Sequence, residues 1–145
     1  MSRIFDSAAD VEDAFYDAID ESDLDKMMAV WADSDDIACL LPMQPLHNGR
    51  QAVRQLWKGV FEQALKIDIS VNHLQWIERG DIAIHLLEEV VRPVGSAQRQ
   101  PPIYAGNVYH YDDTGWHLLL HFNSPTPPPA GVLPPLPGGQ ERRNQ

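Results

Sequence analysis

A polar amide stands among aromatic and aliphatic residues near the C-terminal part of this 145-residue chain. The stretch GNVYHYDDTGWHLLLHF covers residues 106–122 and predicts two strands joined by the turn DDTG. Counting outward from that turn places Asn107 opposite Leu120, on the face that meets the rest of the protein. An unpaired buried amide costs about 1–3 kcal/mol, so Asn107 needs a partner. That partner is either a backbone group or buried water, or the oxygen or hydroxyl of a ligand in a pocket.

The two faces of this predicted hairpin differ in composition. The face expected to meet the helices carries Ala105, Asn107, Tyr109, Tyr111, Trp116, Leu118, Leu120 and Phe122. The opposite face carries Tyr104, Val108, His110, His117, Leu119, His121 and Asn123, which is too apolar for open solvent and too polar for a core. Such a mixed face suits a subunit interface.

The histidines of the hairpin do not form a metal-ligand pattern. His117 and His121 are four residues apart on a strand, which is roughly 13 Å, too far to share a metal ion. His110 and His117 are close enough, but no carboxylate or cysteine completes the set. The chain also has no phosphate loop, nucleophile elbow or dinucleotide fingerprint. We therefore expect neither a metal nor another cofactor.

Charge distribution argues against several classes of partner. Residues 1–36 hold 12 Asp or Glu against Arg3 and Lys26. An acidic front without a basic stripe repels nucleic acid and anionic membranes, and is either a solvated helix face or a docking surface for a basic partner. No apolar run is long enough to span a membrane, and the N-terminus has no export signal. With Cys39 expected to be a buried structural thiol, we expect a cytoplasmic protein.

Hydrophobic spacing predicts the elements that position these residues. Helices are expected over 8–20, from a cap at Ser22 to near Asp33, and within 48–64. A short strand is expected in DIACLL, and four more strands follow from Lys66 onward as a meander. The predicted fold is α+β, with three N-terminal helices on one face of a curved, mainly antiparallel sheet. We expect one domain over 1–124 and a Pro/Gly-rich extended tail over 125–145.

Five pieces of sequence in a fixed order carry a resemblance to a known superfamily. They are AFYDAI, DLDKMMAVWADSD, IACLLPMQPLHNG, AVRQLW and GNVYHYDDTGWHLLLHFNSP. Together they resemble the nuclear transport factor 2-like superfamily, and within it the SnoaL-like, ketosteroid-isomerase-like small proteins. The resemblance implies a cone-shaped, cystatin-like fold with a pocket inside the cone. It also implies a homodimer formed through the outer face of the sheet.

The resemblance implies half of a known catalytic site. The helix tyrosine of the isomerases falls on Tyr16, and their strand acid falls on Asn107, which can still donate a hydrogen bond. Their proton-moving aspartate falls on Leu41, which cannot act as a base. SnoaL-like relatives with the same ending have histidine at the Leu41 and Phe122 positions, so this chain departs from them too. The donor half of the site is retained and the base half is not.

Other residues are candidates for the missing base. His47, on a loop, and His85, Glu88 and Glu89, on the predicted third strand, have suitable chemistry. Each is alternatively a surface or interface group, because alternation alone does not decide which of them face inward. No catalytic residue is assigned on sequence alone, and whether the protein is an enzyme stays open.

The main hypothesis is a binding domain whose pocket accepts a small, mostly apolar molecule without catalysis. Tyr16 and Asn107 would donate hydrogen bonds, and the indole N–H of Trp57 could reach the Tyr16 hydroxyl. The expected pocket walls are Leu41, Trp57, Tyr109, Leu120 and Phe122. One alternative is an isomerase, dehydratase or cyclase that acts through an enolate-like intermediate. Another is a dimerisation module with a filled pocket.

Overall fold

The computed structural model describes residues 5–63, 66–95 and 101–124, so the predicted tail at 125–145 lies outside the described residues. Its helices and strands follow the predicted order. The helices are α1 (Ala8–Glu21), α2 (Leu24–Val30) and α3 (Arg50–Phe61). The strands are β1 (Ala38–Leu40), β2 (His47–Asn48), β3 (Ile67–Arg79), β4 (Ile82–Pro93), β5 (Ile103–Asp112) and β6 (Gly115–Asn123). The α+β class is thereby confirmed.

The boundary between α1 and α2 differs from the prediction. The Ser7 side chain accepts a hydrogen bond from the Asp10 amide and caps α1 as its sequence suggests. Ser22 does not open α2. It ends α1 in a left-handed conformation with φ of 52°, and Asp23 caps α2 by accepting from the Lys26 amide. Serine and aspartate both suit an N-cap, but Ser22 takes the αL conformation that ends α1, so Asp23 is left to cap α2.

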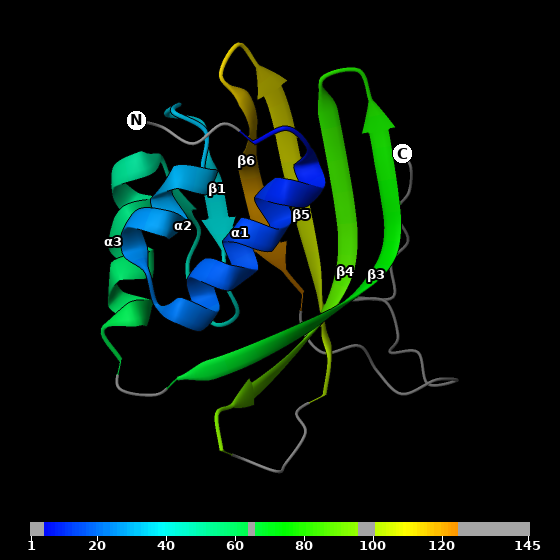
Figure 1. Cartoon of the computed structure of the whole chain (residues 1–145). Coiled ribbons are helices and arrows are strands. Elements are labelled where there is room, and N and C mark those ends of the chain that lie inside the picture. The colour runs from blue at the N-terminus through cyan, green and yellow to red at the C-terminus, as the bar shows by residue number, and fades with distance from the viewer. Residues whose placement is uncertain (1–4, 64–65, 96–100, 125–145) are drawn as a thin grey trace, which may run out of the picture.

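Within the described ranges the strands form one mixed, six-stranded sheet with the order β2-β1-β6-β5-β4-β3. β3 to β6 form the predicted antiparallel meander, but β1 pairs with β6 in parallel, and β2 adds a short strand that the sequence did not suggest. The three helices lie together on one side of the sheet, and the first half of β3 runs below them (Figure 1). The ends of β1, β4 and β6 and the starts of β3 and β5 therefore meet at the lower end of the molecule in that view.

A bulge in the β5–β6 pair overturns the predicted register. Val108 pairs with Leu120 and Tyr109 with Leu118, so Leu119 is the extra residue. One extra residue reverses the faces of everything that follows it, and Asn107 stands opposite His121 rather than Leu120.

Leu120 and Phe122 therefore belong to the outer face and not to the predicted inner wall. They pair with Val108 and Gly106, and Phe122 is 37% exposed. The Phe122 ring lies so close over Gly106 that a Cβ there would overlap it. Only a glycine leaves room for this ring to lie flat against the sheet.

The core lies between the helices and the inner face of the sheet. α1 contributes Phe15, whose ring meets those of Tyr16, Trp31, Trp57 and His121. Arg50, at the start of α3, donates to the carbonyls of Met28, Trp31 and Ala32 and so fixes α3 against the end of α2. No helix in the described ranges is long and apolar enough to cross a membrane.

Candidate functional site

Five polar side chains form a closed ring of hydrogen bonds on the inner face of the sheet. They come from α1 (Tyr16), β4 (Glu89), β5 (Asn107) and β6 (His121 and Asn123). Four of them are almost completely buried, with exposed fractions of 8% for Tyr16, 4% for Glu89, 0% for Asn107 and 1% for His121. Asn107 is thus the inward-facing buried amide that the sequence predicts, and its partners are side chains.

The donors and acceptors of the ring follow from its geometry. The Tyr16 hydroxyl donates to Glu89 Oε2 at 2.7 Å, and Asn107 Nδ2 donates to the Tyr16 oxygen at 3.3 Å. Asn123 Nδ2 donates to Glu89 Oε1 at 3.0 Å. Both nitrogens of His121 meet amide oxygens, Nδ1 at 2.5 Å from Asn107 Oδ1 and Nε2 at 3.0 Å from Asn123 Oδ1. Glu89 receives hydrogen bonds from both directions around the ring, and His121 lies between the two amides.

Burial sets the protonation of two members of this ring. It raises the pKa of Tyr16 well above its ordinary value of 10.0, and the nearby Glu89 carboxylate adds to that shift. It lowers the pKa of His121, although the charge of Glu89 and the hydrogen bond with Asn123 act in the opposite direction. Tyr16 is therefore a hydroxyl donor. His121 Nε2 and Glu89 Oε2 lie 3.9 Å apart, which is within ion-pair distance but beyond hydrogen-bond distance.

A pocket of about 250 Å³ opens beside this ring. Its polar wall consists of Glu89, His121 and Asn123, and Gln44 stands exposed at its edge. Its remaining lining is apolar and comes from every layer of the fold: Ile19, Leu41, Pro42, Trp57, Val60, Ile67, Ile69, Val91 and Ile103. Leu41 and Trp57 thus lie where the sequence suggested pocket walls, whereas Tyr109, Leu120 and Phe122 are not part of this lining.

Trp57 does not make the hydrogen bond expected of it. Its Nε1 is enclosed and has no hydrogen-bond acceptor within geometric limits, so it does not bond Tyr16. The indole lies beside the thiol of Cys39, which is fully buried. Burial raises the pKa of Cys39 to about 12, and the neighbouring indole only partly offsets that effect. The expectation of an inert structural thiol agrees with this environment.

A second buried polar cluster lies farther along the same face and was not predicted. Glu12, on α1, is 3% exposed and accepts from two histidines. Its Oε1 lies 2.8 Å from His85 Nδ1, and its Oε2 lies 2.5 Å from His73 Nε2. Burial raises the pKa of Glu12, but the hydrogen bonds and charges of His85 and His73 outweigh it and leave the pKa below 4.5. Glu12 and Tyr16, one helical turn apart, thus both make buried polar contacts between α1 and the sheet.

The remaining base candidates are separated by the structure. His85 faces inward and is completely buried, with Trp76 stacked on its ring at 4.0 Å, but it does not line the pocket. Glu88 pairs with Tyr104 on the outer side, and its neighbour Glu89 takes the inward position. His47 lies on β2 with its Nδ1 bonded to the Pro45 carbonyl and is also outside the pocket. The inward ionisable groups of the pocket are Glu89 and His121.

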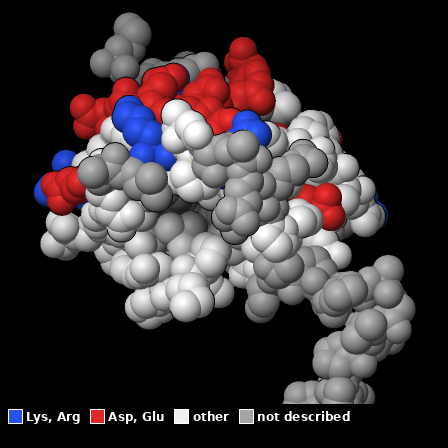
Figure 2. All heavy atoms as spheres, turned by 90° about the horizontal axis from the view of Figure 1, so that it is seen from below, with Lys and Arg blue, Asp and Glu red and all other residues white. Residues whose placement is uncertain are grey.

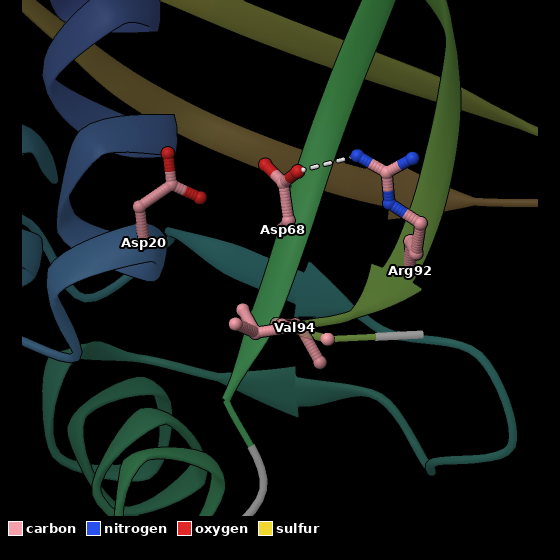
Figure 3. Close-up of a pocket in the computed structure, with 6 residues that line it drawn as sticks. Asp20, Asp68, Arg92 and Val94 are labelled. Atoms are coloured by element: carbon pink, nitrogen blue, oxygen red, sulfur yellow. Dashed lines mark hydrogen bonds and ion pairs between the residues drawn. The ribbon is translucent and has the colours of Figure 1, made fainter. Parts of the chain in front are cut away.

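A second hollow, of about 310 Å³, lies at the surface beside the start of β3 (Figure 3). Asp20 from α1, Asp68 from β3 and Arg92 from β4 point toward it. Arg92 donates to Asp68 at 3.0 Å, and both side chains are nearly half exposed. An exposed ion pair of this kind contributes little to stability, and the first pocket, with its apolar lining and buried polar wall, is the better candidate site.

The directions of these pKa shifts predict how stability depends on pH. Lowered pKa values of His121 and Glu12 in the folded state mean that stability falls as pH drops below about 6.5 and further below about 4.5. Raised pKa values of Cys39, Tyr16 and Tyr109 mean that stability falls as pH rises past about 9 to 10. We expect the thermal unfolding midpoint to be highest between those limits. A midpoint that rises as pH drops from 7 to 5 would contradict these shifts.

Several solved structures have the same fold as this chain. A solved structure from Thiobacillus denitrificans, named for a calcium/calmodulin-dependent protein kinase type II association domain, is 35% identical, with a TM-score of 0.81 over 86% of this chain and 98% of that one. A protein from Streptomyces avermitilis, named as a dehydratase of the nuclear transport factor 2-like family, is 23% identical, with a TM-score of 0.69 over 79% of this chain and 90% of that one. A nuclear transport factor 2-like protein from Pseudomonas putida is 17% identical, with a TM-score of 0.71 over 80% and 82%.

The fold is thus that of the nuclear transport factor 2-like superfamily. The family model described as SnoaL-like domain matches residues 9–128, and the chain belongs to that family. The superfamily inferred from the five sequence pieces is confirmed. No curated protein matches the chain.

Proposed function

We propose that this protein binds a small, mostly apolar molecule in the pocket between its helices and its sheet. The observation that carries the proposal is the pocket itself, about 250 Å³ of largely apolar lining with one wall of buried polar side chains. Apolar walls with a few convergent polar groups are the usual composition of small-molecule sites. The polar end of the ligand would lie against Glu89, His121 and Asn123.

The experiment blocks the pocket with a large side chain at its edge. Leu41 lines the pocket and is half-buried, whereas Leu46, on the same loop, is 59% exposed and does not line it. Native mass spectrometry of protein freshly purified from its own host is expected to show a small bound molecule in the wild type and in the Leu46→Trp control. Leu41→Trp is expected to lose it, because the indole would occupy the ligand's space. Equal retention in both variants would place the ligand elsewhere.

A second candidate function is proton-transfer catalysis of the isomerase, dehydratase or cyclase type. It is favoured by Glu89 and His121, a carboxylate and an imidazole 3.9 Å apart on the pocket wall. A shielded pair of this kind can remove a proton from one carbon and return it to another. Glu89 would replace the base that Leu41 cannot supply. Loss of hydrogen–deuterium exchange on a bound ketone in Glu89→Gln would distinguish catalysis from binding alone.

We also propose a homodimer formed through the outer face of the sheet. In one copy of the chain this face exposes aromatic side chains, with Tyr104 at 43% and Phe122 at 37%. The same surface on a second copy would cover them symmetrically, as in most homodimers. Light scattering should then give twice the mass of one chain, and a Phe122→Asp variant should give half of that.

A further inference from the structure

The polar wall of the pocket uses its own hydrogen-bond donors internally. The Tyr16 hydroxyl is committed to Glu89 Oε2. Both hydrogens of the Asn123 amide are also committed, one to Glu89 Oε1 and the other to the Tyr104 carbonyl at 3.2 Å. His121 directs both ring nitrogens at amide oxygens. No donor of these groups is left to point into the pocket.

Acceptor capacity does remain on the same wall. A carboxylate offers about four lone-pair positions and an amide oxygen two. The described hydrogen bonds use one on each oxygen of Glu89, and one on the Asn123 oxygen. The orientation of the Asn123 amide follows from its partners, because turning it around would set its oxygen against two other acceptors, Glu89 Oε1 and the Tyr104 carbonyl oxygen. With the amide so oriented, the wall suits a ligand atom that donates hydrogen bonds.

The other polar groups of the lining do not supply a buried hydrogen-bond donor to the pocket. Trp57 has an indole N–H, but that atom is enclosed beside Cys39 and is not accessible from the pocket. Gln44 is exposed at the edge, where its amide is hydrated by solvent. A carbonyl or carboxylate ligand would therefore meet lone pairs at the polar wall and find no buried donor to stabilise it.

The charge of the wall distinguishes among possible donors. Glu89 is 4% exposed, and a carboxylate so far from water needs a positive partner. Burial lowers the pKa of His121, which limits how much positive charge the histidine supplies.

Outside the pocket, α1 ends with exposed Asp17, Asp20 and Glu21. Figure 2 views the molecule from the end at which β1, β4 and β6 finish, and acidic side chains gather along one edge of that face. Such a field attracts cations.

Building on the proposed function, we propose that the ligand is a small organic amine, protonated on nitrogen and apolar elsewhere. Its ammonium group would donate to Glu89 and to the Asn123 oxygen, and its hydrocarbon part would lie against Trp57 and the aliphatic lining. The pairing neutralises a buried carboxylate and satisfies unused acceptors at once. This wall of acceptors prefers a ligand that donates hydrogen bonds, whereas a site that stabilises an oxyanion needs donors on the protein.

The test uses four probes of nearly equal size that differ in one polar group: benzylamine, benzyl alcohol, benzaldehyde and benzoate. Each is titrated at neutral pH into the full ¹⁵N-labelled chain, and affinity is taken from chemical-shift changes of residues lining the pocket. Benzylamine is expected to bind about tenfold more tightly than benzyl alcohol, because a hydrogen bond to a charged group is the stronger. Benzaldehyde should bind more weakly than the alcohol, and benzoate should not bind.

Matched variants assign the preference to the carboxylate. Glu89→Gln should bring benzylamine to the affinity of benzyl alcohol, while Glu88→Gln, one residue along on the outer face, should leave it unchanged. If benzaldehyde or benzoate bound as tightly as benzylamine, the amine preference would be overturned, and the proposed binding of a small molecule in this pocket would stand. Failure of all four probes would overturn both the proposed function and the amine preference.

Discussion

Replacing His121 by leucine is expected to lower the free energy of unfolding by about 3–5 kcal/mol. Leucine has a similar volume, so little packing is lost. The expected loss arises because Asn107 and Asn123 both lose their contact with the imidazole, one of their oxygens loses its N–H donor, and Glu89 loses the nearby ring. Asn107 is completely buried and does not line the pocket, so water cannot replace the contact that it loses.

Urea unfolding followed by circular dichroism measures this effect. The control is His110→Leu, because His110 is also paired with a carboxylate, Asp81, but at the surface. That variant should change the free energy of unfolding by less than about 0.5 kcal/mol. A loss below about 1 kcal/mol for His121→Leu would show that the ring is not important for stability.

Replacing Glu12 by alanine is expected to have the next largest effect, a loss of about 3 kcal/mol. Glu12 is the carboxylate that joins α1 to both β3 and β4, through His73 and His85. Without it, the fully buried His85 ring loses the acceptor for its Nδ1 proton. The variant should also change the fluorescence of Trp76, whose indole stacks on that imidazole.

The neighbouring residue provides the matched control for Glu12. Asp13 is exposed, and its pKa is raised by partial burial and then by the charges of Glu12 and the other nearby acids. Asp13→Ala should therefore leave stability unchanged or increase it slightly, and leave the Trp76 emission as it is. Equal losses in the two variants would point to a general effect on α1 and not to the buried contacts of Glu12.

Much of the fold could be predicted from the sequence because its periodic signals are strong. The apolar spacing over 8–20 predicts α1, and alternation after Lys66 predicts β3 and β4. The inward position of Asn107 was also predictable, since its alternation with Tyr109 is unaffected by the bulge. These features depend on local pattern, which one sequence contains in full.

The rest of the site depends on a single inserted residue that leaves no mark on composition. Leu118, Leu119 and Leu120 are identical in type, so a bulge among them changes no hydrophobic pattern. It does reverse the predicted faces of residues 120–123, so that His121 faces the helices and Phe122 lies on the outer face. Only the pairing with β5 and β1 in three dimensions decides which is correct.

One signal of the second polar cluster was present in the sequence. Glu12 lies on the same helical stripe as Ala8, Phe15 and Ile19, all of which are buried. A carboxylate in the middle of an apolar stripe needs a buried partner, because charged groups are rarely buried alone. The identity of that partner was not predictable, since His73 and His85 lie more than sixty residues away along the chain.

The parallel contact between β1 and β6 affects the order in which this protein can form during synthesis. Residues 38–40 pair in parallel with residues 120–122, and α1 packs on β3 and β6. The ribosome must therefore release nearly the whole domain before the first helices can cover their apolar faces. Chains whose contacts are distant in sequence fold slowly, and they expose hydrophobic surface until folding is complete. This protein should depend on chaperones more during translation than after it.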